Sequence, residues 1–341
     1  MKQFLLVSFA LALCAGCDTP GSAPRDSAAG AGSEASARTF RGEYPIKATA
    51  TVGMVADIVR NVGGEHVRVT QLMGSGVDPH LYRVTRDDVQ TMLGGDMIFY
   101  SGLMLEGKMS DTLVKLANNK CVVAVTERID EAQLLEPEDL AGHYDPHVWM
   151  DVSAWANCVD AVAAALTDFD PSHADSYRTN ADVYRQRLMQ LDEYGRRSLG
   201  SIPAQRRVLI TSHDAFNYFG RAYGLEVLGV QGLSTESEAG LQRVNELVAL
   251  IAAQGIRAVF VESSVPRKNI EALVEGARAK GYDVRIGGEL FSDAMGEAGT
   301  YEGTYVGMLD HNITVVTRAL GGDAPDRGMQ GKLSHARGAG E

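Results

Sequence analysis

Residues 170–200 read DPSHADSYRTNADVYRQRLMQLDEYGRRSLG, and this stretch predicts one long amphipathic helix. Its apolar residues recur at spacings of three and four, with charged residues between them: Tyr177, Ala181, Tyr184, Leu188 and Leu191. Asp170-Pro171 is a typical N-cap and first-turn pair, and Gly200 ends the pattern. A helix of roughly 25 residues is about 38 Å long. We therefore expect residues 171–200 to form a rigid strut that links two domains.

Short apolar runs alternate with helical patterns on both sides of this strut. KATATV (47–52) and CVVAVT (121–126) are examples before it, and RVLITS (207–212) and AVFVES (258–263) are examples after it. Such alternation predicts parallel sheets that are covered by helices. The expected fold class is α/β, with two parallel-sheet lobes at residues 44–170 and 201–322 joined by one long rigid helix.

The two ends of the chain differ in composition from this body. A charged start and a short apolar run lead to LCAGC, which predicts a signal peptide at residues 1–16 and lipidation of Cys17. Residues 17–43 are rich in Gly, Ser and Ala, so we expect a flexible, lipid-anchored tether. Residues 323–341 are polar and Gly-rich and are expected to be disordered. The protein should then be an exported lipoprotein, in the periplasm or on the cell surface.

The tripeptide Asp-Pro-His occurs twice, in VDPHLY (77–82) and DPHVWM (145–150). In both copies an aliphatic residue and then an aromatic residue follow the histidine. The feature that the copies share is therefore His80 in the first and His147 in the second. His143 has no counterpart, because a glycine stands four residues before the first histidine. Histidine is a common ligand of transition metals, so His80 and His147 are candidate ligands.

The local sequence separates His147 from its neighbours. Two ligands four residues apart need a continuous helix, and Pro146 biases the residue before it away from the helical region. We therefore expect His143 to be a solvated loop residue and His147 to be the ligand. The pair Asp145-Pro146 can cap the helix that begins there and so fix the direction of the ring. Asp151 is expected to make local hydrogen bonds rather than to bind metal.

Further candidates follow strands of the second lobe. His213 comes directly after RVLITS, and the loop GGELFSDAMGEAGTYEGTY (287–305) follows another strand. In open parallel sheets, ligands bind beyond the carboxyl ends of strands. The loop offers four carboxylates, and the residues alone leave open which of them belongs to the site: Glu289, Asp293, Glu297 and Glu302.

These motifs together resemble the cluster A-I (TroA/ZnuA-type) solute-binding lipoproteins, and most of all the TroA-like members. The resemblance runs from about residue 44 to residue 320 and includes SHDAFNYFGRAYG (212–224) and VFVESSVPRKN (259–269). It implies delivery of Zn²⁺ or Mn²⁺ to an ABC importer, with one ion bound as solute in the cleft between two lobes. It also implies a ligand set carried over motif by motif: His80, His147, His213 and, from LFSDAMG, Asp293.

Two features bear on the identity of the ion. Zinc-dedicated members of this family resemble one another in a His-rich loop, whereas RIDEAQLLEPEDLAGHY (128–144) contains only His143. Manganese-dedicated members resemble one another in having Glu at the third ligand, where this chain has His213. Imidazole suits Zn²⁺ and carboxylate suits Mn²⁺. The sequence leaves the ion open between the two.

Other functions are disfavoured. The net charge of −12 argues against a nucleic-acid partner. A hydrolytic zinc site keeps an open position for water, whereas three histidines and one aspartate fill four positions, and no H-E-x-x-H motif is present. Glu262 could act as a base, but we expect it to orient a ligand histidine. A surface adhesin with a structural metal is the second alternative. We expect a monomeric binding protein, not an enzyme, whose partners are a membrane permease and its cytoplasmic ATPase.

Overall fold

The computed structural model describes residues 39–137 and 142–334. The predicted signal peptide, Cys17, the tether up to residue 38 and residues 335–341 lie outside these ranges and stay predictions. We call residues 44–170 the N-terminal half and residues 201–322 the C-terminal half. Within the described residues, no helix is long and apolar enough to cross a membrane.

The N-terminal half contains one parallel sheet of four strands in the order β2-β1-β3-β4. The strands are β1 (Ile46–Ala50), β2 (Val67–Gln71), β3 (Met97–Tyr100) and β4 (Cys121–Ala124). The helices are α2 (Gly53–Gly63), α3 (Arg86–Gly94), α4 (Ser110–Ala117) and α5 (Val152–Phe169). The buried residues of β3 are all apolar, and those of β1 are apolar except Thr49, as expected for parallel strands covered on both sides.

The C-terminal half contains two parallel strand pairs, β5–β6 and β7–β8, and β5 also lies beside β7. The strands are β5 (Val208–His213), β6 (Glu226–Gln231), β7 (Ala258–Glu262) and β8 (Arg285–Leu290). The helices are α7 (Asn217–Tyr223), α8 (Leu241–Gln254), α9 (Lys268–Ala279) and α10 (Tyr305–Ala319). The expected α/β class with parallel sheets is confirmed.

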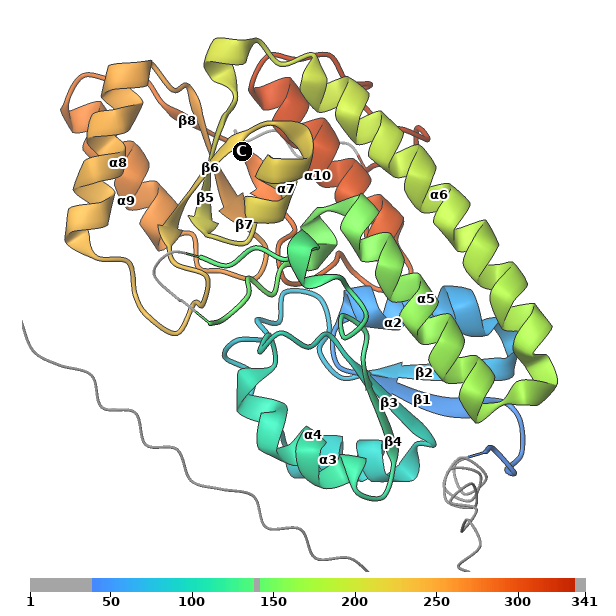
Figure 1. Ribbon diagram of the computed structural model, residues 1–341. Coiled ribbons are helices and arrows are strands. Elements are labelled where there is room, and N and C mark those ends of the chain that lie inside the picture. Colours follow the sequence, from blue (N-terminus) through green and yellow to red (C-terminus); the bar gives the residue numbers. More distant parts are fainter. Residues whose placement is uncertain (1–38, 138–141, 335–341) are drawn as a thin grey trace, which may run out of the picture. The chain divides into compact units, whose positions relative to one another are not determined.

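The predicted strut is helix α6 (Ala174–Gly200), and all five residues of its apolar stripe are buried. Figure 1 shows α6 running past α5 and α2 and on past α10. It also contacts α7. One continuous hydrophobic core includes the stripe together with residues of β1, β3, α5 and α10. The strut therefore packs against elements of both halves.

The start of the strut differs from the prediction. A 3₁₀ turn, Pro171–His173, precedes α6, and Asp170 forms no side-chain cap. Its carboxylate is buried and accepts hydrogen bonds from Tyr44 Oη (2.8 Å), His173 Nδ1 (2.7 Å) and Tyr177 Oη (2.7 Å) instead. The three donors are all side-chain groups, so the carboxylate binds them in place of the backbone N–H groups that a capping residue would hold.

The predicted disorder of residues 323–341 is wrong for residues 323–334. Ala324 and Leu333 are buried. The N–H of Met329 donates to Asp310 Oδ1 (2.8 Å), and the N–H and hydroxyl of Ser334 donate to Glu302 Oε1 (2.9 and 2.7 Å). The polar, Gly-rich composition of this segment indicates too little apolar surface for it to fold. Two buried apolar side chains and two acidic acceptors are nevertheless enough to hold residues 323–334 against the body of the protein.

We expect Leu188→Ala to lower the free energy of unfolding by about 2–5 kcal/mol, because it opens a cavity in the packed stripe of α6. Leu188 is 1% exposed and its neighbour Met189 is 70% exposed. Met189→Ala is therefore the matched control, with an expected change of less than ~0.5 kcal/mol. Urea unfolding measures both. Equal effects of the two substitutions would show that the stripe does not hold the halves.

Candidate metal centre

The four predicted ligands come from four separate segments. His80 lies in the loop after β2, and His147 directly precedes the 3₁₀ turn Val148–Met150. His213 is the last residue of β5, and Asp293 lies three residues after the end of β8. Three of the four thus follow the carboxyl ends of parallel strands, where such folds bind ligands.

These residues meet at one point. One ligand atom from each of His80, His147, His213 and Asp293 lies within 4.8 Å of all the others. Nε2 of His80 is 3.2 Å from Nε2 of His147. Asp293 Oδ1 is 3.4 Å from Nε2 of His147, and Asp293 Oδ2 is 3.2 Å from Nε2 of His213. A tetrahedral ion with ligands at ~2.0–2.1 Å separates neighbouring ligand atoms by roughly 3.3–3.4 Å. These three spacings are close to that separation, and the remaining pairs lie within 4.8 Å.

The ligand atoms are also withdrawn from water. His147 and His213 have no exposed surface, Asp293 is 1% exposed and His80 is 7% exposed. Within the described residues, Nε2 of His213 and Oδ1 of Asp293 are buried without a hydrogen-bond partner. Buried polar atoms normally have partners, so two unsatisfied atoms that face the same point suit a cation there.

Two buried carboxylates orient two of the histidines. Asp145 Oδ1 accepts from Nδ1 of His147 (2.7 Å) and from its backbone N–H (2.9 Å). Glu262 Oε2 accepts from Nδ1 of His213 (2.6 Å), and Glu262 Oε1 accepts from its backbone N–H (3.0 Å). A proton held on Nδ1 leaves the lone pair of Nε2 directed at the centre, which is the usual arrangement of metal-binding histidines.

The electrostatics of the cluster centre on Asp293. Burial alone would raise the pKa of this carboxyl group, but His213 and His147 hold it well below its usual value. Burial alone would lower the pKa of His147, but Asp145 and Asp293 outweigh it and raise this pKa to about 9. The pKa of His213 is likewise raised, against burial, by Glu262 and Asp293. Burial lowers the pKa of His80 to about 4. Without metal, therefore, two imidazolium ions surround one carboxylate.

The other candidates stay apart from this cluster. His143 is exposed. Asp151 accepts from the N–H groups of Ser153 and Ala154 and so caps α5, which confirms its expected local role. Of the acidic alternatives, Glu289 and Glu297 are exposed and Glu302 is held by Ser334. Glu262 contacts His213, as predicted for an orienting residue.

The sequence predicts a helix-capping role for Asp145 and no role for Asp78. Asp145 Oδ1 does accept the N–H of His147, but only a 3₁₀ turn follows, and α5 begins at Val152. Asp78 Oδ1 accepts the N–H of His80 in the same way (2.9 Å). The repeat itself could have indicated the role of both aspartates, because each stands two residues before a candidate ligand.

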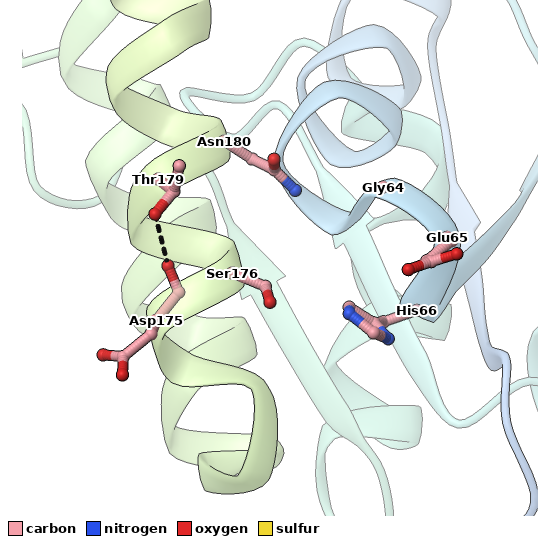
Figure 2. Close-up of a pocket in the computed structure, with 7 residues that line it drawn as sticks. All are labelled: Gly64, Glu65, His66, Asp175, Ser176, Thr179 and Asn180. Atoms are coloured by element: carbon pink, nitrogen blue, oxygen red, sulfur yellow. Dashed lines mark hydrogen bonds between the residues drawn. The ribbon is translucent and has the colours of Figure 1, made fainter.

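A hollow lies away from the cluster, at the start of α6. It has a volume of about 490 Å³ and is lined by Gly64, Glu65, His66, Asp175, Ser176, Thr179 and Asn180. In Figure 2 its side chains come from α6 and from the turn before β2. The ring of His66 stacks on His173 with centroids 3.8 Å apart. Across the described parts of the chain, only the His80 cluster assembles three or more metal-type ligands.

Comparison with known proteins gives a consistent assignment. Residues 49–319 match the family model described as "ZnuA: Zinc-uptake complex component A periplasmic". The manganese-binding lipoprotein MntA of Bacillus subtilis is 49% identical over 82% of this chain and 90% of its own. The zinc-binding protein TroA of Treponema pallidum is 50% identical over 79% of this chain and 87% of its own.

Solved structures agree with these matches. The periplasmic zinc-binding protein TroA from Treponema pallidum superposes with a TM-score of 0.79 at 49% identity, over 81% of this chain and 99% of that one. The Fe(III)-bound YtgA from Chlamydia trachomatis gives a TM-score of 0.74 at 28% identity, over 82% and 99%. Similar folds are thus described with different metals.

We expect metal binding to release about two protons at neutral pH, because His147 and His213 carry raised pKa values and must lose a proton to become ligands. Affinity should therefore rise with pH at least until about 9, the pKa of His147. Below that, it should fall by up to roughly 100-fold per pH unit while two protons are displaced. Calorimetry in buffers of different ionisation enthalpy counts the protons. Release of no proton at pH 7.5 would contradict this account.

We expect His147→Ala to weaken Zn²⁺ binding by well over ~100-fold, more than the loss of an orienting partner costs. His143→Ala removes an exposed ring outside the cluster and should leave the affinity unchanged, which makes it the matched control. Competition with a chelating dye measures both variants. Equal losses would mean that His147 is not a ligand.

Proposed function

This chain belongs to the ZnuA family of zinc-uptake components, and we propose that it captures one Zn²⁺ or Mn²⁺ ion and delivers it to an ABC importer. The observation that carries the proposal is the set of four buried ligand atoms, one from each residue, that lie within 4.8 Å of one another. We propose His80, His147, His213 and Asp293 as the ligands, and Asp145 and Glu262 as the residues that orient two of them.

The ligand set suits binding better than catalysis. A catalytic zinc ion keeps one position for water or substrate, whereas the proposed ligands occupy four positions with protein atoms. The curated relatives MntA and TroA are named as metal-binding proteins. A relative from Streptococcus anginosus, PsaA, is named a manganese ABC transporter substrate-binding lipoprotein. We therefore propose a transport protein without enzymatic activity.

The chemistry of the ligands favours Zn²⁺ over Mn²⁺ at equal free concentration. Affinity for a given site is lowest for Mn²⁺ among the first-row divalent ions, and imidazole is a better ligand for Zn²⁺ than for Mn²⁺. The ion that the protein carries in the cell depends in addition on which ion is available there. For that reason the proposal includes both ions, as the names of the two relatives at about 50% identity do.

The proposed place of action is the outer face of a membrane. Cys17 would carry the lipid and residues 17–43 would act as the tether, which lets a monomeric body reach a permease in the same membrane. The permease and its cytoplasmic ATPase would be the partners. The lipoprotein names of several relatives support this arrangement.

We expect the metal-free body, made as the soluble Cys17→Ser protein, to bind one equivalent of Zn²⁺ and, more weakly, one equivalent of Mn²⁺. Competitive calorimetry measures which of the two ions binds more tightly. Elemental analysis of protein purified without chelator identifies the ion that the protein retains. Asp293→Ala is the control, since it removes the only anionic ligand and should weaken both ions. A body that binds neither ion would refute the proposed function, and Mn²⁺ binding tighter than Zn²⁺ would refute the ligand assignment.

A further inference from the structure

The aspartates of the two Asp-Pro-His repeats make matching contacts. In each, Oδ1 accepts the backbone N–H of the repeat's own histidine at 2.9 Å. In each, Oδ2 accepts a hydrogen bond from a side chain of the C-terminal half. For Asp78 the donor is Thr235 Oγ1 (2.5 Å), and for Asp145 it is Asn217 Nδ2 (3.1 Å).

We propose that Asp78 and Asp145 are positioning residues that tie the two histidines of the N-terminal half to the C-terminal half, and that the Asp78–Thr235 hydrogen bond is the latch whose opening releases the ion. This inference rests on the proposed function. Each aspartate holds the backbone of a ligand with one oxygen and the opposite half with the other, so separation of the halves acts directly on the ligand.

The side around Asp145 is firmly bound. Besides Asn217, Tyr218 Oη donates to the carbonyl of Asp145 (3.0 Å). Trp149 Nε1 donates to the carbonyl of Ser292 (2.9 Å), and Tyr305 Oη donates to the carbonyl of Trp149 (2.7 Å). These contacts are buried and involve rigid aromatic side chains. Opening at His147 would therefore break several buried hydrogen bonds together.

The side around Asp78 is held by much less. Beyond the Thr235 bond, the structure shows an ion pair between Lys108 and Glu236 at 2.8 Å. Its side chains are 31% and 51% exposed, and exposed ion pairs contribute little. His80 is also the most exposed of the three histidines. Among the residues that the structure describes, the latch is thus the main polar contact between the halves on this side.

Both partners of the latch lie in loops. Thr235 belongs to the segment 232–240 between β6 and α8, and Asp78 belongs to the segment 72–85 between β2 and α3. Neither loop is part of the packed stripe of α6. Release then requires two loops to part and His80 to withdraw, while α6 and the contacts around His147 stay in place. The ion would keep three ligands until the last step.

The test is Thr235→Val, which keeps the shape of the side chain and removes the donor. Ser234→Ala in the same loop is the matched control, because Ser234 Oγ contacts only the N–H of Glu236 among the described residues. We expect Thr235→Val to raise the rate of Zn²⁺ dissociation into excess chelator by about tenfold or more, since hydrogen bonds to charged groups are among the stronger ones. The control should match the wild type. The Co²⁺ absorption spectrum and the 1:1 stoichiometry should not change.

A double-mutant cycle with Asp78→Ala separates the latch from a general loss of structure. If Thr235 acts through Asp78, Thr235→Val should have no further effect on the dissociation rate in the Asp78→Ala background. Two results would overturn the latch: additive effects of the two substitutions, or a dissociation rate of Thr235→Val within about twofold of that of Ser234→Ala. In either case, metal binding by the wild type would still support the proposed function. A wild type that binds neither Zn²⁺ nor Mn²⁺ would overturn both.

Discussion

Burial of one face of α6 against both halves is the constraint on which the rest of this structure depends. The four ligands come from segments that are up to 213 residues apart in the chain, from Asp293 back to His80, yet their ligand atoms meet within 4.8 Å. Such a meeting needs the two halves fixed to within a fraction of an ångström. The stripe from Tyr177 to Leu191 supplies this, because it belongs to the same continuous core as β1, β3, α5 and α10. Close-packed interiors deform little, so the packing of the core fixes the positions of the ligand residues.

The site carries the same positive charge in both states, as two protons on histidines when it is empty and as one divalent ion when it is loaded. A buried carboxylate normally becomes neutral, but Asp293 stays ionised because two imidazolium rings surround it. Those rings are in turn held by Asp145 and Glu262. When a divalent ion enters, it takes the place of the two protons, and the same carboxylates then fix the rings with Nε2 toward the ion. The contacts of Asp145 and Glu262 with the histidines are thus the same with and without the ion, and little rearrangement is needed for the ion to bind.

The sequence predicts the parallel α/β architecture and picks out the three histidines that the structure brings together, and the reasons are physical. The period of the α6 stripe and the position of each histidine relative to a strand are local features. Asp293 is different, because the loop after β8 contains several carboxylates of equal chemistry, and only the folded chain shows that Glu289 and Glu297 are exposed and that Glu302 is engaged by Ser334. The bonds of Asp170 to Tyr44 and Tyr177, and those that hold residues 323–334, likewise join distant parts of the chain. No local pattern could reveal them.

A binding protein for transport must hold its ion tightly and still give it up. Four protein ligands in a dry site favour holding, and a core that joins both halves through α6 resists any opening of the whole molecule. The two Asp-Pro-His repeats meet both requirements because they offer the same ligand but differ in how many contacts they make with the C-terminal half. The repeat at His147 is bound to α7, and Tyr305 holds the carbonyl of Trp149 two residues further on, whereas the repeat at His80 contacts a loop through one hydrogen bond. The same tripeptide can therefore anchor the ion at one side and let it leave at the other.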